Sequence, residues 1–197
     1  ARGAREPGMP GSPEAAGGAH AKGPEPLFRV SLAQWSLNRA LFGGRLTHLD
    51  FPKIARREFD LEGVEYVNAF FKDKAGDAAY LAEMNRVCAG EGVTQLLIMC
   101  DGEGDLGDPD DAARARAVDN HRRWADAART LGCHSIRVNA HSRGAREEQA
   151  RLVADGLRRL TEHCAGAGLS CIVENHGGLS SDAAWLTDVM RRVDHLR

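Results

Sequence analysis

The sequence contains no long apolar run, carries little net charge and has few cysteines. A membrane-spanning helix needs about 20 predominantly apolar residues in a row, so a membrane is not an expected partner. The 26 lysine and arginine residues are balanced by 28 aspartate and glutamate residues. Nucleic-acid binding depends on a basic surface, so nucleic acid is not expected as a partner either. The five cysteines form no C-x-x-C pair, which disfavours a disulfide framework and a cysteine-rich zinc site.

The composition of the chain changes near residue 27. Residues 1–26 hold five of the seven prolines, mixed with glycine, alanine and serine. Such a segment cannot bury enough apolar surface to offset the entropy lost on ordering, so we predict a disordered Pro/Gly-rich tail. The tail lacks the apolar segment of an intact signal peptide but would suit a spacer behind a removed one. A cytoplasmic and an exported location therefore both stay open.

From residue 27 onward, short apolar segments alternate with stretches of helical periodicity. The segments of strand length are residues 28–35, 64–68, 94–100, 135–139 and 170–174. Helical spacing marks residues 77–90, 112–131 and 149–164. Two further helices are expected, one capped by Asp50 ahead of Phe51-Pro52 and one capped by Ser180 or Ser181. This alternation over five units predicts an α/β fold with a parallel sheet.

Polar residues within the strands favour a TIM-type (β/α) barrel over an open doubly wound sheet. Strands buried on both faces of an open sheet are expected to be continuous apolar runs. Here Arg137 and Asn139 alternate with apolar residues in the fourth segment, and Glu174 ends the fifth. Side chains of this parity would share a polar interior. A complete barrel needs eight units and about 250 residues, so residues 27–197 are predicted to form a partial barrel of about five β/α units.

The strongest candidate site is Glu174-Asn-His-Gly-Gly, at the end of the fifth apolar segment. A carboxylate that faces a barrel interior is costly unless it is paired or bound to a metal. Glu174 is therefore a candidate metal ligand and catalytic residue, with a buried ion pair to Arg137 as the alternative. His176 shares the parity of Glu174, which makes it a candidate catalytic ligand or proton donor.

Three more residues at strand ends are candidates for substrate binding. Asn139 is placed to bind a substrate hydroxyl at the end of the fourth segment. His141 follows two residues later and is either a substrate contact or a solvated loop histidine. Trp35 ends the first segment, where an indole can stack on a sugar face or pack in the core.

An acidic, glycine-rich loop covers residues 101–109. Its glycines match G-x-G-x-x-G, but its four carboxylates would repel a pyrophosphate, so we predict no dinucleotide site there. It also resembles the start of a calcium loop, except that Leu106 replaces the required glycine. Asp101 and Glu103 remain further candidates for the site.

Five sequence segments at these strand positions carry a resemblance to a known family. They are Ser31-Leu-Ala-Gln-Trp-Ser, Gly63-Val-Glu-Tyr-Val-Asn, Leu97-Ile-Met-Cys-Asp-Gly-Glu-Gly, Ser135-Ile-Arg-Val-Asn and Ile172-Val-Glu-Asn-His-Gly-Gly. Together they resemble the xylose-isomerase-like TIM-barrel superfamily, in particular its bacterial sugar phosphate isomerase/epimerase-like proteins. The resemblance covers about residues 27–197 and implies a barrel truncated after its fifth unit.

This resemblance implies a divalent metal, Mn²⁺, Mg²⁺, Co²⁺ or Zn²⁺, held by Glu, Asp, His and Glu side chains. Glu174 matches the first of these ligands, and the other three would lie on later strands. The implied activity of the full-length protein is that of a sugar or keto-sugar isomerase or epimerase, with proton transfer through an enediolate. Glu174 and His176 would be catalytic, and a small sugar would be bound by Asn139, Trp35, His141 and Arg137.

Two other functions stay open at this point. One is a non-catalytic half-barrel with a sugar-binding or structural role. The other is an AP-endonuclease-like phosphodiesterase, which needs a histidine-rich metal cluster that the second and third strand ends do not supply. An isolated five-strand unit would also expose a sheet edge, which favours a homo-oligomer.

Overall fold

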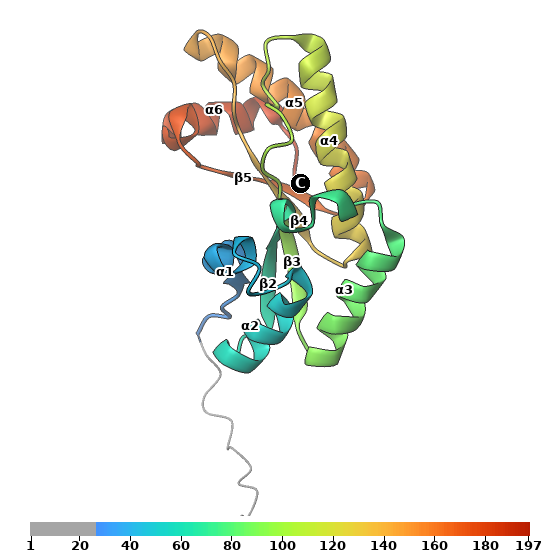
Figure 1. Ribbon diagram of the computed structural model, residues 1–197. Coiled ribbons are helices and arrows are strands. Elements are labelled where there is room, and N and C mark those ends of the chain that lie inside the picture. The colour runs from blue at the N-terminus through green and yellow to red at the C-terminus, as the bar shows by residue number, and fades with distance from the viewer. Residues whose placement is uncertain (1–26) are drawn as a thin grey trace, which may run out of the picture.

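A computed structural model describes residues 27–197, so the predicted tail over residues 1–26 lies outside the described residues. Five strands form one parallel sheet in the order β1-β2-β3-β4-β5 (Figure 1). The strands are β1 (Leu32–Ala33), β2 (Gly63–Val67), β3 (Thr94–Met99), β4 (Ser135–Asn139) and β5 (Ser170–Glu174). Each strand pairs with the next one along the chain, as in a TIM barrel. The prediction of a partial barrel built from five β/α units is confirmed.

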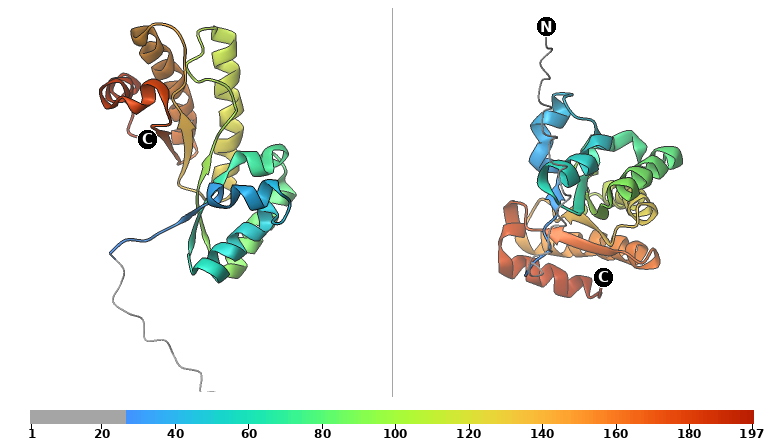
Figure 2. Two further views of the ribbon diagram at one scale, coloured as in Figure 1. Left: turned by 60° about the vertical axis from the view of Figure 1, so that its left-hand side comes forward. Right: turned by 90° about the horizontal axis from the view of Figure 1, so that it is seen from below.

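Helices α1 to α5 lie between consecutive strands, and α6 follows β5 (Figure 1). The five helices from α2 onward were predicted and begin or end within a few residues of the expected limits, whereas the short helix α1 was not predicted. They are α1 (Asn38–Phe42), α2 (Phe51–Phe59), α3 (Ala78–Glu91), α4 (Asp111–Thr130), α5 (Arg146–Gly166) and α6 (Ala183–Val193). Figure 2 shows them from two further directions, with the extended residues before β1, in blue, leaving the body of the fold. Among the described helices, none has both the length and the apolar content needed to cross a membrane.

The two capping predictions need correction. Asp182 caps α6, since its Oδ1 accepts a hydrogen bond from the Trp185 amide at 3.0 Å. The hydroxyls of Ser180 and Ser181 bond to the backbone of Gly177 instead, at 2.7 and 3.1 Å, and stabilise the preceding 3₁₀ turn.

Asp50 occupies the N-cap position of α2, but its side chain does not bond to the helix. Its Oδ2 accepts a hydrogen bond from the Thr47 amide at 3.0 Å. The carboxylate therefore stabilises the turn that leads into α2, while Pro52 lies in the first turn of the helix, where a missing amide hydrogen has no cost.

The first strand is much shorter than the predicted segment 28–35. After Ala33 the chain turns into the 3₁₀ helix η1 (Gln34–Leu37), so Trp35 lies on this turn and not on a strand. The cause is Gln34, which is fully buried. Its Oε1 accepts a hydrogen bond from the Val67 amide at 3.0 Å, and its Nε2 lies 2.9 Å from His48 Nδ1. These bonds fix the turn against the end of β2.

The two faces of the sheet differ in polarity. Side chains that point toward the helices, among them Val64, Ile98 and Ile136, are fully buried in the main core. Arg137 and Glu174 point to the opposite face of the sheet, which borders a cavity. This difference confirms the predicted polar interior and its alternation along β4 and β5.

The loop between β3 and α4 packs tightly against α5. Leu106 is fully buried, and its carbonyl oxygen would lie 1.9 Å from a Cβ atom built on Gly156. The next residue, Gly107, donates its amide hydrogen to the His141 carbonyl at 3.0 Å. The loop is therefore held on α5 and on the β4–α5 connection.

We expect Gly156→Ala to lower the free energy of unfolding by about 3 kcal/mol, because the new methyl group would collide with backbone that cannot move freely. Gly166→Ala in the same helix has open space around its Cβ position and is the control. Removing glycine there should be neutral or stabilising by up to about 1 kcal/mol. Urea unfolding of both variants checks the prediction, and equal effects would contradict it.

We also expect the 197-residue chain to self-associate. The outer edge of β5 has no strand partner within the described residues, and Ile172, on the pocket face of β5, is 41% exposed. Sedimentation should show concentration-dependent association that Ile172→Lys weakens. A monomer with a sharp, cooperative, high-temperature melt would contradict this expectation.

Candidate functional site

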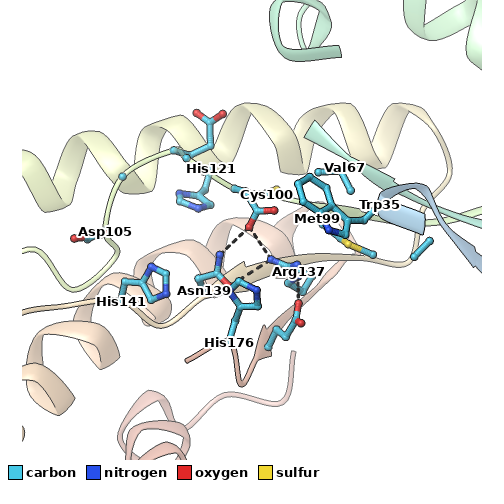
Figure 3. Close-up of a pocket in the computed structure, with 16 residues that line it drawn as sticks. Trp35, Val67, Met99, Cys100, Asp105, His121, Arg137, Asn139, His141 and His176 are labelled. Carbon is cyan, nitrogen blue, oxygen red and sulfur yellow. Dashed lines mark hydrogen bonds and ion pairs between the residues drawn. The ribbon is translucent and has the colours of Figure 1, made fainter. Parts of the chain in front are cut away.

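A cavity of about 650 Å³ lies at the carboxyl ends of the strands, where TIM barrels place their active sites (Figure 3). The structure brings all six predicted site residues to its wall: Trp35, Arg137, Asn139, His141, Glu174 and His176. Asp101 and Glu103, named as further candidates, line it too. The location of these residues is thus observed, whereas their chemical roles remain predictions.

Arg137 links three strand ends across the floor of the cavity. Its Nη1 donates a hydrogen bond to Asp101 Oδ1 at 2.8 Å, and its Nε lies 2.5 Å from Glu174 Oε2. The contact with Glu174 is a close ion pair, but it is not a hydrogen bond because the Nε hydrogen does not point at the carboxylate oxygen. The arginine side chain is 11% exposed, against 41% for that of Glu174. The ion pair considered as the alternative role of Glu174 is therefore present.

Asn139 completes this polar group. Its Nδ2 donates to Asp101 Oδ1 at 2.8 Å, and its Oδ1 lies 3.3 Å from Arg137 Nη1 (Figure 3). The carboxylate of Asp101 thus accepts from two side chains through a single oxygen. Its second oxygen takes part in no hydrogen bond with residues 27–197 and remains available as an acceptor.

Asn68 holds the acidic loop in place, although it was not among the residues predicted for the site. This fully buried residue begins the 3₁₀ helix η3 (Asn68–Lys74). Its Nδ2 donates to the Asp101 carbonyl and to Glu103 Oε1, both at 2.9 Å, and its Oδ1 accepts from the Asp101 amide at 3.0 Å. One amide side chain therefore satisfies the loop backbone and a buried carboxylate together.

His121 also lines the cavity, and sequence reasoning missed it because helical spacing placed it on the apolar stripe of residues 112–131. Its Nδ1 lies 2.7 Å from the Ala117 carbonyl oxygen. Burial lowers the pKa of His121, opposed by that hydrogen bond and by the charges of Glu103 and Asp101. Burial also raises the pKa of the neighbouring Cys100 thiol well above its usual value, which disfavours the reactive thiolate.

The described residues do not by themselves form a metal site. Within residues 27–197, no three His, Cys, Asp or Glu side chains converge closely enough to hold a metal ion. Glu174 offers a carboxylate to the cavity, but Arg137 already neutralises it. The metal implied by the resemblance therefore stays a prediction.

The fold and the strand-end cavity define a TIM-barrel protein with a candidate site at the carboxyl ends of its strands. A family model described as xylose isomerase-like TIM barrel matches residues 55–197, and the chain belongs to this family. Among curated proteins, no sequence matches the chain significantly.

Several solved structures share the fold. D-psicose 3-epimerase from Clostridium cellulolyticum H10 superposes with a TM-score of 0.65 at 13% identity, over 76% of this chain and 55% of that protein. The probable 3-DHS dehydratase AsbF from Bacillus anthracis superposes with a TM-score of 0.64 at 16% identity, over 86% of this chain and 60% of that protein. The 3-keto-D-glucoside 4-epimerase YcjR from E. coli superposes with a TM-score of 0.53 at 16% identity, over 68% of this chain and 56% of that protein. The chain spans a little over half the length of each, and identities this low show a common fold alone.

Replacing Asn68 by aspartate should destabilise the protein by about 2–4 kcal/mol, because a buried oxygen would then face Glu103 and the Asp101 carbonyl without a hydrogen to donate. Asn38→Asp is the control, since the Asn38 amide bonds to a carbonyl at the exposed surface. Urea unfolding should show a change below about 1 kcal/mol for the control. Similar losses in both variants would show that Asn68 has no special role.

Proposed function

We propose that the protein is a sugar or keto-sugar isomerase or epimerase that moves a proton next to a carbonyl group. The observation that carries this proposal is the convergence of Glu174, Asp101, Arg137 and Asn139 on one strand-end cavity in a xylose isomerase-like barrel. The names of two fold neighbours, a psicose epimerase and a ketoglucoside epimerase, support the same class of reaction.

Glu174 is the proposed base. Its partly exposed carboxylate lies at the end of β5, held by the guanidinium of Arg137, so it can accept a proton from a carbon placed in the cavity. His176 follows on the same side and would return a proton or contact a substrate oxygen. Asn139 and His141 would bind hydroxyl groups, and Trp35, whose side chain is half exposed, would stack on the sugar ring.

The charges around the cavity favour an uncharged sugar over a sugar phosphate. Four carboxylates line it: Asp101, Glu103, Asp105 and Glu174. Arg137 is the only lysine or arginine among the described lining residues, and it is already paired on two sides. A phosphate group would meet net repulsion there, whereas hydroxyl groups can donate to carboxylate oxygens.

A divalent metal remains part of the proposal, on the strength of the resemblance. When bound, such a metal would polarise the carbonyl and hydroxyl oxygens of the sugar. Glu174 is the described residue proposed as its ligand. A sugar-binding protein without turnover is the second candidate, because the described residues lack a three-ligand group of their own.

The test is deuterium exchange in D₂O with D-fructose and D-tagatose in the presence of Mn²⁺. We expect deuterium at the carbon next to the carbonyl, and a loss of at least about 100-fold in exchange rate for Glu174→Gln, as for the removal of a general base. Glu148→Gln is the matched control, because Glu148 also pairs with an arginine, at 2.7 Å, but on the outer surface of α5.

Three outcomes separate the candidates. Loss of exchange with an unchanged melting temperature supports a catalytic role for Glu174, as base or as metal ligand. Unaltered exchange in a well-folded Glu174→Gln protein rejects it. Saturable sugar binding without exchange in the unmodified protein would identify a sugar-binding module instead.

A further inference from the structure

His121 lies in the cavity wall, but it does not contact Arg137, Asp101 or Glu174 through a hydrogen bond or ion pair, and the proposed mechanism gives it no role. It lies on α4, one helical turn after Ala117, and only 3% of its surface is exposed. It nevertheless borders the cavity, and Figure 3 shows its imidazole pointing from the helix toward the space beside Asn139 and His141.

The hydrogen bond to Ala117 fixes the position of the ring proton. A backbone carbonyl can only accept, so Nδ1, at 2.7 Å from the Ala117 oxygen, must carry the hydrogen. Burial lowers the pKa of His121, which favours the neutral form of the ring. In a neutral ring with its hydrogen on Nδ1, the other nitrogen, Nε2, carries a lone pair and acts as an acceptor.

Nothing in the described part of the chain uses this acceptor. Among residues 27–197, His121 makes no hydrogen bond through Nε2. His48 provides a contrast, because its Nε2 is also without a partner but is sealed in the core. Since the cavity reaches His121 and does not reach His48, only the His121 nitrogen is open to a ligand.

The backbone around His121 is arranged to let the ring reach the cavity. Gly104 in the acidic loop has φ +97°, and a Cβ atom there would lie 3.0 Å from the Ala117 side chain. The loop therefore lies directly on α4 one turn before His121, with no side chain of its own at that point. Asn68 and Asn120 hold the same loop through Glu103, at 2.9 and 3.1 Å.

We propose that His121 contacts the ligand directly, with Nε2 accepting a hydrogen bond from a hydroxyl group of an uncharged sugar. This inference rests on the proposed function, because it takes the cavity to be the sugar site. The surrounding wall supports it, since the free oxygen of Asp101 is another acceptor and a polyhydroxylated ligand supplies the matching donors. A ligand that can only accept hydrogen bonds would find no partner at this nitrogen.

Nitrogen NMR of the protein labelled with ¹⁵N-histidine tests the premise before any ligand is added. The His121 signals should report hydrogen on Nδ1 and none on Nε2. Titration with D-fructose should then move the Nε2 signal of His121 in step with binding. Hydrogen on Nε2 in the free protein would overturn the inference, as would an Nε2 signal that stays fixed while the sugar binds.

Affinity measurements with variants supply an independent test. His121→Phe keeps the ring shape without the acceptor and should weaken D-fructose binding about 3- to 10-fold, the loss of one neutral hydrogen bond. His121→Gln can place an oxygen near the Nε2 position and should recover most of the affinity. His163→Phe is the control, because His163 pairs with Asp126 away from the cavity, and it should bind as tightly as the unmodified protein.

The outcomes distinguish this inference from the proposed function. Undiminished binding by a folded His121→Phe protein rejects the role of His121 and leaves the isomerase proposal intact. Weakened binding in a protein that never exchanges deuterium supports the role of His121 and rejects turnover. If D-fructose and D-tagatose do not bind the unmodified protein at all, both proposals fail.

Discussion

The guanidinium of Arg137, placed between Asp101 and Glu174, is the interaction on which the site depends. An arginine that is only 11% exposed is costly to bury, and two carboxylates from the neighbouring strand ends compensate for that cost. The two carboxylates in turn would repel each other without the cation between them. The ends of β3, β4 and β5 are therefore tied to one charge, and Asn139 adds hydrogen bonds to the same group.

This arrangement divides the sheet into two chemically different faces. Val64, Ile98 and Ile136 bury their side chains against the helices, where the hydrophobic effect supplies the main stabilisation. On the other face, charges and amides remain partly exposed in the cavity. A pocket of this kind has many acceptors and one compensated cation, which suits a ligand that donates hydrogen bonds.

The acidic loop forms one wall of the cavity, and close packing and buried hydrogen bonds hold it from several sides. Leu106 rests on Gly156 of α5, and Asn68 binds the loop backbone from the end of β2. Buried networks of this kind resist motion because each broken bond leaves an unsatisfied polar group. The positions of Asp101 and His121 are therefore fixed by contacts within the protein, as the proposed site would require.

Much of the fold could be predicted from the sequence, because strand–helix alternation and the parity of polar residues are local patterns. The limits of β4 and β5 were predicted to the residue, and the polar interior followed from Arg137, Asn139 and Glu174. The early turn after Ala33 was not predictable, since it depends on Gln34 bonding to Val67, 33 residues away. Ser180 and Ser181 were predicted to cap α6, but in the folded chain their hydroxyls bond to Gly177, and Asp182 is the cap.

The sequence by itself determined which residues reach the cavity from the strand ends, because alternation and the parallel order of strands fix the side of each residue. Only the tertiary structure decided how they are paired: Glu174 with Arg137, and Asp101 with both Arg137 and Asn139. It also brought Asn68 and His121 to the site. Their spacing along the chain resembles that of core residues, and their hydrogen bonds and cavity contacts exist only once loop, helix and sheet have packed together.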